Sequence, residues 1–312
     1  MQIRLHKNAT TTPAQREFIQ KNPHLSTACL AEKTGVSKTT VRRWRNRSNV
    51  YDRPHTPKRI KTAITPVEEV AIILCRMATR AGLDDLHKIV GSLLGITCSR
   101  ASLNRCLKRY HISKRSSLNN SIPFDLKDYT GTYFYYNCFH LPDLSGPDSP
   151  VFFHTLLDCS FRVFHATQSL SGPDFLNRHI RDFPLKVLGI IHEDPVVLSP
   201  KEGRRIKQDH AQMVESLCRS SNLVSHHLDT QYPEALQKLT ETCTTLQKAP
   251  KYQSWDFPWA SGTGFAEHIS RYNTGLTLGA LKQKTPHQVL ESHYTHFPGS
   301  FRQKPQAAVM SL

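Results

Sequence analysis

The chain has 312 residues, 38% of them hydrophobic, and a formal net charge of +16. A chain of this length holds two or three domains, each with its own hydrophobic core. No apolar run approaches the roughly 18 residues that a membrane-spanning helix needs, and we recognise no signal peptide. These features argue against a membrane partner and predict a cytoplasmic protein.

The excess of positive over negative charge lies entirely in the N-terminal part of the chain. Residues 1–118 contain 23 Lys and Arg against 7 Asp and Glu, whereas residues 119–312 contain 18 of each kind. A block of like charge repels itself, so it indicates a polyanionic partner. A membrane surface is one such polyanion, but no wide amphipathic helix and no lipidation signal supports it. We therefore expect double-stranded DNA as the partner.

Cysteine and histidine are frequent, but their spacing does not indicate a metal site. The eight cysteines form no CxxC pair, which predicts reduced thiols in a cytoplasmic protein. Among the 17 histidines, His226 and His227 are adjacent but lack a second ligand pair at zinc spacing. We therefore assign no metal to these residues.

Residues 26–47, STACLAEKTGVSKTTVRRWRNR, predict two short helices joined by a tight turn. Ser26 and Ser37 are good N-cap residues, and Gly35 suits a turn with positive φ. Trp44 is expected to face inward from the second helix. This helix would enter the major groove of DNA and contact the flanking phosphates. The residues assigned to DNA binding here are Ser37, Lys38, Thr39, Thr40, Arg42, Arg43, Arg45 and Arg47.

A helix over Ala14–Lys21 is expected before this pair, because Pro13 suits a first helical turn, and it completes a domain over 1–48. A solvated basic helix in an unrelated α-domain is the alternative interpretation. Residues 49–64 are basic and contain two prolines, so they predict an extended linker along DNA; a structureless spacer is equally compatible. The linker residues assigned to DNA binding are Arg53, Lys58, Arg59 and Lys61.

A second helix-turn-helix domain is expected over residues 65–113. Thr65-Pro66-Val67-Glu68 is a capping box with proline at the first helical position. Two further helices follow, the last over Ser99–Tyr110, and a polar linker covers 114–130. Such a unit would also contact duplex DNA. Its DNA-binding residues are Arg100, Arg105, Lys108 and Arg109.

From residue 131 the pattern changes to short strands alternating with helices. The aromatic segment Tyr133–Leu141 predicts the first strand. Two antiparallel strands, a helix, a buried strand over Lys186–Ile191, a helix, a strand and a last helix follow. This order predicts a mixed α/β layer over 131–296, with a flexible tail over 297–312.

Four segments resemble bacterial insertion-sequence transposases with a retroviral-integrase-type core. They are RLHKNATTTPAQR with GVSKTTVRRWRNR, DRPHTPKRIKTAITPVEE running on to SRASLNRCLKRYHIS, KDYTGTYFYYNCFHLP, and RYNTGLTLGALKQKTPHQVL. The resemblance implies an RNase H-like core that joins DNA strands with two Mg²⁺ ions held by an Asp-Asp-Glu triad. It also implies a homodimer or higher oligomer on DNA, associated with the bacterial nucleoid. The expected fold class is therefore multidomain α plus α/β, with two helix-turn-helix units before an RNase H-like core.

The triad that the resemblance implies is not in place. Asn137 stands where the first acid belongs, and an amide cannot balance the charge of a metal ion. Glu193 or Asp194 is the candidate for the second acid after a short shift. Thr240 occupies the third position, and neighbouring Glu241 is no automatic replacement because one residue turns a helical side chain by ~100°. Solvated surface acids are the alternative interpretation of these carboxylates.

Three functions stay open on the sequence alone. The first is a DNA-binding protein of the transposase and integrase lineage whose core no longer cuts DNA. The second is an active, Mg²⁺-dependent transposase that uses Glu193 or Asp194, Glu241 and an unidentified first ligand. The third is a decayed copy of a mobile element with no present role. No cofactor is assigned, except Mg²⁺ in the second case.

Overall fold

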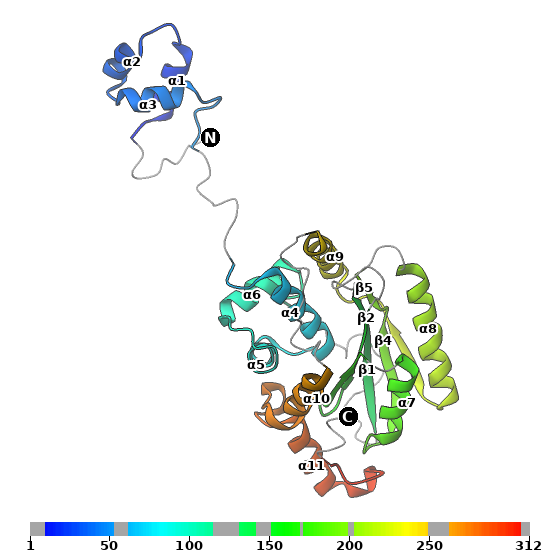
Figure 1. Ribbon diagram of the computed structural model, residues 1–312. Coiled ribbons are helices and arrows are strands. Elements are labelled where there is room, and N and C mark those ends of the chain that lie inside the picture. The colour runs from blue at the N-terminus through cyan, green and yellow to red at the C-terminus, as the bar shows by residue number, and fades with distance from the viewer. Residues whose placement is uncertain are drawn as a thin grey trace. The chain divides into compact units, whose positions relative to one another are not determined.

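In the computed structural model the chain divides into two compact units, Met1–Lys61 and Thr62–Leu312 (Figure 1). The structure describes residues 10–52, 62–114, 131–141, 151–168, 171–198, 203–248 and 262–306. The linker residues Arg53, Lys58, Arg59 and Lys61 lie outside these ranges, so their assignment to DNA stays a prediction. Within these ranges, every helix is too short or too polar to cross a membrane.

The first unit is a small three-helix domain. Its helices are α1 (Pro13–Lys21), α2 (Thr27–Thr34) and α3 (Lys38–Arg45). Its core consists of four side chains that are at most 1% exposed: Ile19, Leu30, Val41 and Trp44. One or two large apolar residues from each helix therefore meet at the centre, as the sequence predicts for Trp44.

Local capping fixes where these helices begin. The Ser26 hydroxyl accepts a hydrogen bond from the Cys29 amide at 3.2 Å, and the Ser37 hydroxyl accepts one from the Thr40 amide at 3.2 Å. Between them, Gly35 has a φ of +69°, and a Cβ added there would meet nothing within 4 Å. Glycine is thus required for the left-handed backbone and not for lack of space.

The second unit opens with three helices: α4 (Pro66–Thr79), α5 (Leu83–Leu93) and α6 (Arg100–Arg109). The predicted capping box at the start of α4 is present. The Thr65 amide donates to the Glu68 carboxylate at 2.7 Å, and the Glu68 amide donates to the Thr65 hydroxyl at 3.3 Å. Ser99 caps α6 in the same way as Ser37 caps α3.

The described strands form one mixed sheet in the spatial order β3-β2-β1-β4-β6, with β5 paired to β1. The strands are β1 (Thr132–Leu141), β2 (Val151–Asp158), β3 (Phe164–Thr167), β4 (Val187–Glu193), β5 (Val196–Val197) and β6 (Val224–Leu228). β1, β2 and β3 pair antiparallel, whereas β4 is parallel to β1 and β6 is parallel to β4. The predicted mixed α/β layer is confirmed.

Helices cover both faces of this sheet (Figure 1). α7 (Gly172–Asp182) and α8 (Gly203–Ser220) pack on the face to which Phe134 and Tyr136 of β1 point. α4 and α9 (Pro233–Gln247) pack on the opposite face, to which Phe139 points. Because side chains alternate along a strand, Tyr135 and Asn137 share the face of Phe139.

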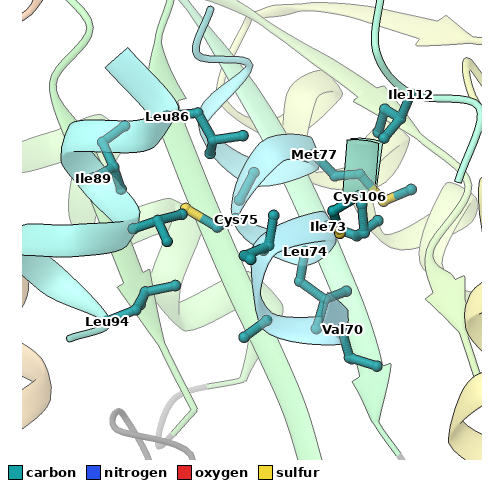
Figure 2. Close-up of a cluster of buried hydrophobic side chains, with 14 of the residues drawn as sticks. Val70, Ile73, Leu74, Cys75, Met77, Leu86, Ile89, Leu94, Cys106 and Ile112 are labelled. Atoms are coloured by element: carbon teal, nitrogen blue, oxygen red, sulfur yellow. The ribbon is translucent and has the colours of Figure 1, made fainter. Parts of the chain in front are cut away.

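Helix α4 is buried along nearly its whole length. Figure 2 shows part of its apolar cluster, with Ile73 and Cys75 of α4, Leu86 of α5 and Cys106 of α6 among the labelled side chains. The ten residues of α4 from Val70 to Thr79 are all buried. The same apolar cluster includes Phe139 of β1 and Leu239 of α9. The helices of the predicted second domain, 65–113, therefore share one hydrophobic core with the α/β layer, although a polar linker separates them in sequence.

The C-terminal part also packs on the sheet. It contains α10 (Gly262–Ser270), a π-helical turn η3 (Arg271–Gly275), short 3₁₀ turns η4 (Gly279–Leu281) and η5 (Pro298–Ser300), and α11 (Pro286–His296). The Asn273 amide group pairs with both backbone groups of Phe164 at 2.8 Å, and so extends the hydrogen bonding of edge strand β3. Phe301 forms a β-bridge with Leu185. The described part of the tail predicted as flexible, 297–306, is mostly exposed; Phe301 is half-buried against the core, and Arg302 and Gln303 donate hydrogen bonds to the backbone carbonyls of Pro184 and Asp182.

Buried aromatic and imidazole rings stack between the sheet and α8. The ring of Tyr136 lies 5.4 Å from that of His210 and 5.9 Å from that of His154, which accepts or donates at 2.8 Å to the tyrosine hydroxyl. His192 lies 6.0 Å from His210. Burial lowers the pKa of His154 and His210 to about 4 and that of His192 to about 3. These imidazoles are therefore neutral in the folded protein at neutral pH.

Replacing His210 with Phe is expected to make the second unit less sensitive to acid. The unfolded chain binds a proton at this histidine below its ordinary pKa of 6.5, whereas the folded chain does not until about 4. Stability is therefore lost as the pH falls through this interval. Between about pH 7.5 and about pH 5, the wild type should lose roughly 1–2 kcal/mol more free energy of unfolding than His210→Phe, measured by urea unfolding.

The control is His296→Gln, at an exposed histidine of α11, which should follow the wild type. An identical pH dependence in His210→Phe and the wild type would contradict the neutral, buried state of this imidazole.

Candidate functional site

One face of α3 carries exposed polar and basic side chains at helical spacing. Lys38, Thr39, Arg42 and Arg43 are all exposed, while Val41 and Trp44 on the other side are buried. Residues three and four apart lie on the same side of a helix, so Thr39 shares a stripe with Arg42 and Arg43. Short polar groups followed by guanidiniums are suited to base edges and phosphates, respectively.

The other predicted DNA-binding residues of this segment make contacts within the protein. Arg45 donates to the backbone carbonyl of Leu25 and, at 3.5 Å, to the hydroxyl of Thr27. The Ser37 hydroxyl caps α3 and lies 2.9 Å from the Thr40 hydroxyl. These three side chains of the predicted set thus hold α3 in place, which the sequence pattern did not reveal.

Two guanidiniums lie close over the ring of Trp44. The Arg16 guanidinium carbon is 4.0 Å from the ring centroid and that of Arg47 is 4.2 Å away. Arg16 is 2% exposed and also pairs with Asp52 at 3.2 Å and with the Val50 carbonyl at 2.8 Å. Arg47 is thus a stacking residue as well as a predicted DNA-binding one. Both contacts fix the rotation of α3, and hence the direction of its exposed stripe.

The predicted basic residues of α6 fall into two groups. Arg105 and Lys108 are exposed, and Arg105 donates to the Ser102 hydroxyl at 3.1 Å. Arg100 pairs with Asp84 at 2.5 Å on the surface. Arg109 forms an ion pair with Glu69 of α4, and its backbone carbonyl accepts from Lys238 of α9 at 2.7 Å.

This second group connects α6 to its neighbours. The carboxylates of Asp84 and Glu69 neutralise Arg100 and Arg109, respectively. A phosphate contact by either residue would have to break an existing ion pair. The free positive charge of the described residues of α6 is therefore smaller than its sequence predicts.

Two of the predicted catalytic positions lie side by side in the sheet. In the parallel pairing of β1 with β4, Tyr136 is opposite His192, so Asn137 and Glu193 follow on adjacent strands and share one face. Asn137 is 7% exposed, and its amide nitrogen has no hydrogen-bond partner within the described residues. The sequence predicts both positions, but only the register brings them together.

Both carboxylate oxygens of Glu193 accept hydrogen bonds from protein donors. Its Oε1 accepts from the Tyr135 hydroxyl and from Arg80 at 3.4 Å, and its Oε2 accepts from the Gln231 amide at 3.1 Å. Burial raises the pKa of Glu193, against the effect of these three donors. Arg80 was not singled out in the sequence, because 113 residues separate it from its carboxylate partner.

Asp194 points to the other side of the sheet. Its carboxylate accepts from Lys207 of α8 and from His227 of β6, both at 3.1 Å. Burial alone would raise the pKa of Asp194, but these two hydrogen bonds outweigh it and the pKa is lowered. Because α8 covers the face opposite Asn137, Asp194 cannot replace Glu193 as a partner of that residue.

The third position lies on α9. Thr240 donates to the Leu236 carbonyl at 2.9 Å, one helical turn back. Glu241 is exposed and accepts from Gln237 at 3.2 Å. It is two residues from Leu239, which packs in the core, so it points away from the sheet.

The residues present therefore do not fit a pair of magnesium ions. Such a pair needs several carboxylates that converge on one point, because the two ions lie only about 3.5–4 Å apart. Of the three positions that the sequence resemblance predicts, the first is an amide, the second is a carboxylate hydrogen-bonded to protein donors, and the carboxylate beside the third points outward. Nowhere in the described part of the chain do three or more His, Cys, Asp or Glu residues converge as metal ligands would.

No family model matches the chain, and no curated protein matches its sequence. The solved structures that are similar to it in part include the following two. One is the intasome of simian T-cell lymphotropic virus in complex with the PP2A regulatory subunit B56 gamma, with a TM-score of 0.30 and 13% identity over 72% of this chain and 71% of that chain. The other is the Mos1 strand transfer complex, with a TM-score of 0.26 and 12% identity over 78% of this chain and 99% of that chain. At these scores the likeness assigns no function.

Replacing Arg45 with Ala is expected to destabilise the first unit. The change removes the hydrogen bonds that tie the end of α3 to the start of α2, at a cost of about 1 kcal/mol. Hydrogen exchange of the α2 and α3 amides in the full chain measures the loss. Arg42→Ala, at an exposed position of the same helix, is the control and should exchange like the wild type. Equal protection in the Arg45 variant and the wild type would contradict the internal role of Arg45.

Proposed function

We propose that the chain is a double-stranded DNA-binding protein of the transposase and integrase lineage, and that α3 is its recognition helix. The exposed stripe formed by Lys38, Thr39, Arg42 and Arg43 carries this proposal. It combines short polar and basic groups on one side of a helix whose other side is anchored by Trp44. Phosphate contacts would come from the guanidiniums and base contacts from Thr39 and Arg43.

The charge of the chain supports a nucleic acid as the partner. The described residues of the first unit include eight Lys and Arg against three Asp and Glu. Some of this charge is used internally, as for Arg16 and Arg45, but the stripe on α3 has no acidic neighbour in contact among the described residues. Basic side chains gathered on a helix are the electrostatic footprint of DNA binding.

In this proposal the α/β layer is a folded platform and not a nuclease. The alternation of its strands and helices supports the RNase H-like core that the sequence resemblance implies. The positions of Asn137, Glu193 and Glu241 argue against two-metal chemistry there. The platform would carry contacts between copies of the chain on DNA, as a homodimer or higher oligomer.

The double variant Arg42→Ala, Arg43→Ala is expected to bind duplex DNA more weakly. Each lost phosphate contact lowers the slope of log K against log salt by about 0.9, so the slope should fall by between about one and about two. Titration of a labelled duplex at several salt concentrations measures affinity and slope together.

The matched control is Arg205→Ala, Arg219→Ala, which removes the same charge from exposed positions of α8. It should leave the slope close to that of the wild type. Unchanged affinity and slope in the α3 variant would rule out α3 as the recognition helix.

The chain is expected not to nick or join DNA with Mg²⁺ or Mn²⁺. The reason is that its carboxylates do not converge on one point of the sheet. Incubation of the full chain with supercoiled plasmid and with duplex ends in either metal checks this. Metal-dependent nicking that disappears in Glu241→Ala would show that the core is an active enzyme.

A further inference from the structure

The middle of β1 and the C-terminal end of β4 form a small polar site beneath the C-terminal end of α4. Tyr135 and Asn137 of β1 and Glu193 of β4 share the sheet face that α4 covers. All three are largely buried, with Glu193 the most exposed at 12% of its side chain. A buried carboxylate is costly unless a cation or several donors neutralise it. Glu193 therefore requires a neighbouring cation or several hydrogen-bond donors.

The guanidinium of Arg80 reaches into this site from the end of α4. Arg80 is 3% exposed, and its Nη1 lies 3.0 Å from the Tyr135 hydroxyl and 3.4 Å from Glu193 Oε1. Its guanidinium carbon is 4.7 Å from the centroid of the Tyr135 ring. One cation thus contacts the carboxylate, the hydroxyl and the aromatic face.

The backbone at Arg80 adopts a conformation that arginine rarely takes. Its φ is +48° in the left-handed region, where it serves as the C-cap of α4. Residues with a Cβ rarely adopt this conformation, because the Cβ lies too close to the following carbonyl oxygen. The preceding carbonyl, of Thr79, accepts a hydrogen bond from Arg162. Contacts at the site and at this carbonyl therefore hold the helix end in place despite its strain.

The hydrogen bonds leave no oxygen of Glu193 without a donor. The Tyr135 hydroxyl donates to Oε1 while it accepts from Arg80, and the Gln231 amide donates to Oε2 at 3.1 Å. Burial and the nearby carboxylate raise the pKa of Tyr135, so its hydroxyl stays protonated and remains a donor. A metal ion could bind Glu193 only by displacing these donors.

We propose that the Arg80 guanidinium takes the place of a divalent metal ion at this point of the sheet, as a permanent internal cation that joins α4 to β1 and β4. The ion pair stands on the structure alone; the proposed lineage enters only in naming a divalent metal as the group that is replaced. Arg80 then has two effects. It neutralises Glu193, and it makes the α/β layer depend on α4.

A double-mutant cycle on the full chain tests the ion pair. Arg80→Met leaves Glu193 buried without its cation, so the melting temperature should fall by roughly 10 °C. Adding Glu193→Gln to that variant should recover much of the loss, because the uncompensated charge is gone. Arg100→Met is the control: its partner Asp84 is 73% exposed, and the melting temperature should change by no more than about 1 °C.

Manganese binding tests the replacement of the metal. Electron paramagnetic resonance should detect no Mn²⁺ bound to the wild type when the Mn²⁺ concentration is about millimolar. This concentration would reveal even a weak protein site for the ion. In Arg80→Met, Asn137→Asp, two carboxylates face each other without the guanidinium, and Mn²⁺ should bind and raise the melting temperature.

Three outcomes would overturn the proposal. They are additive effects of Arg80→Met and Glu193→Gln, Mn²⁺ binding in the wild type that Glu193→Gln removes, and a folded Arg80→Met, Asn137→Asp variant that binds no Mn²⁺. Where the last variant fails to fold, the cycle and the wild-type titration decide. Neither readout involves DNA, so a failure of α3 to bind DNA leaves this result unaffected.

Discussion

The structure of the second unit depends on the burial of helix α4 against the sheet. Ten consecutive residues of this helix, Val70–Thr79, are buried. The apolar ones belong to one cluster with residues of α5, α6 and α9 and with Phe139 of β1. At about 25 cal/mol per Å² of apolar surface, such burial outweighs any single polar contact in the unit. The same packing places the C-terminal end of α4 over β1 and β4, so that Arg80 contacts Glu193. The position of one cation thus follows from hydrophobic packing.

Arginine has three different roles in this chain, and its environment decides which one. On the outer side of α3, Arg42 and Arg43 are exposed and available to a polyanion. Arg16 and Arg45 are hydrogen-bonded inside the first unit, where they orient α3. Arg80 is buried with a carboxylate in the sheet. A net charge of +16 therefore overstates the charge that DNA would meet, because a guanidinium with protein acceptors has less to offer a phosphate.

The acids of the α/β layer show how alternation along a strand decides chemistry. Glu193 and Asp194 are neighbours in sequence, yet they lie on opposite faces, one toward α4 and the other toward α8. In an alignment of sequences, a shift of one residue would place either of them at the predicted position of a metal ligand. In the sheet, the pairing of β4 with β1 and β6 fixes the register, and a shift would turn every buried side chain of β4 to the wrong face.

The sequence alone determined the local structure. It determined where helices begin, through Pro13, Ser26, Ser37 and Thr65, and the order of strands and helices, through the spacing of apolar residues. These features depend on residues within one or two helical turns, so their signals are complete in a short window. Only the tertiary structure decided that 65–113 shares a core with the sheet, that Arg45 is internal, and that Arg80 neutralises Glu193. The contact between Arg80 and Glu193 joins residues 113 positions apart, and no local pattern encodes which distant side chain a residue will contact.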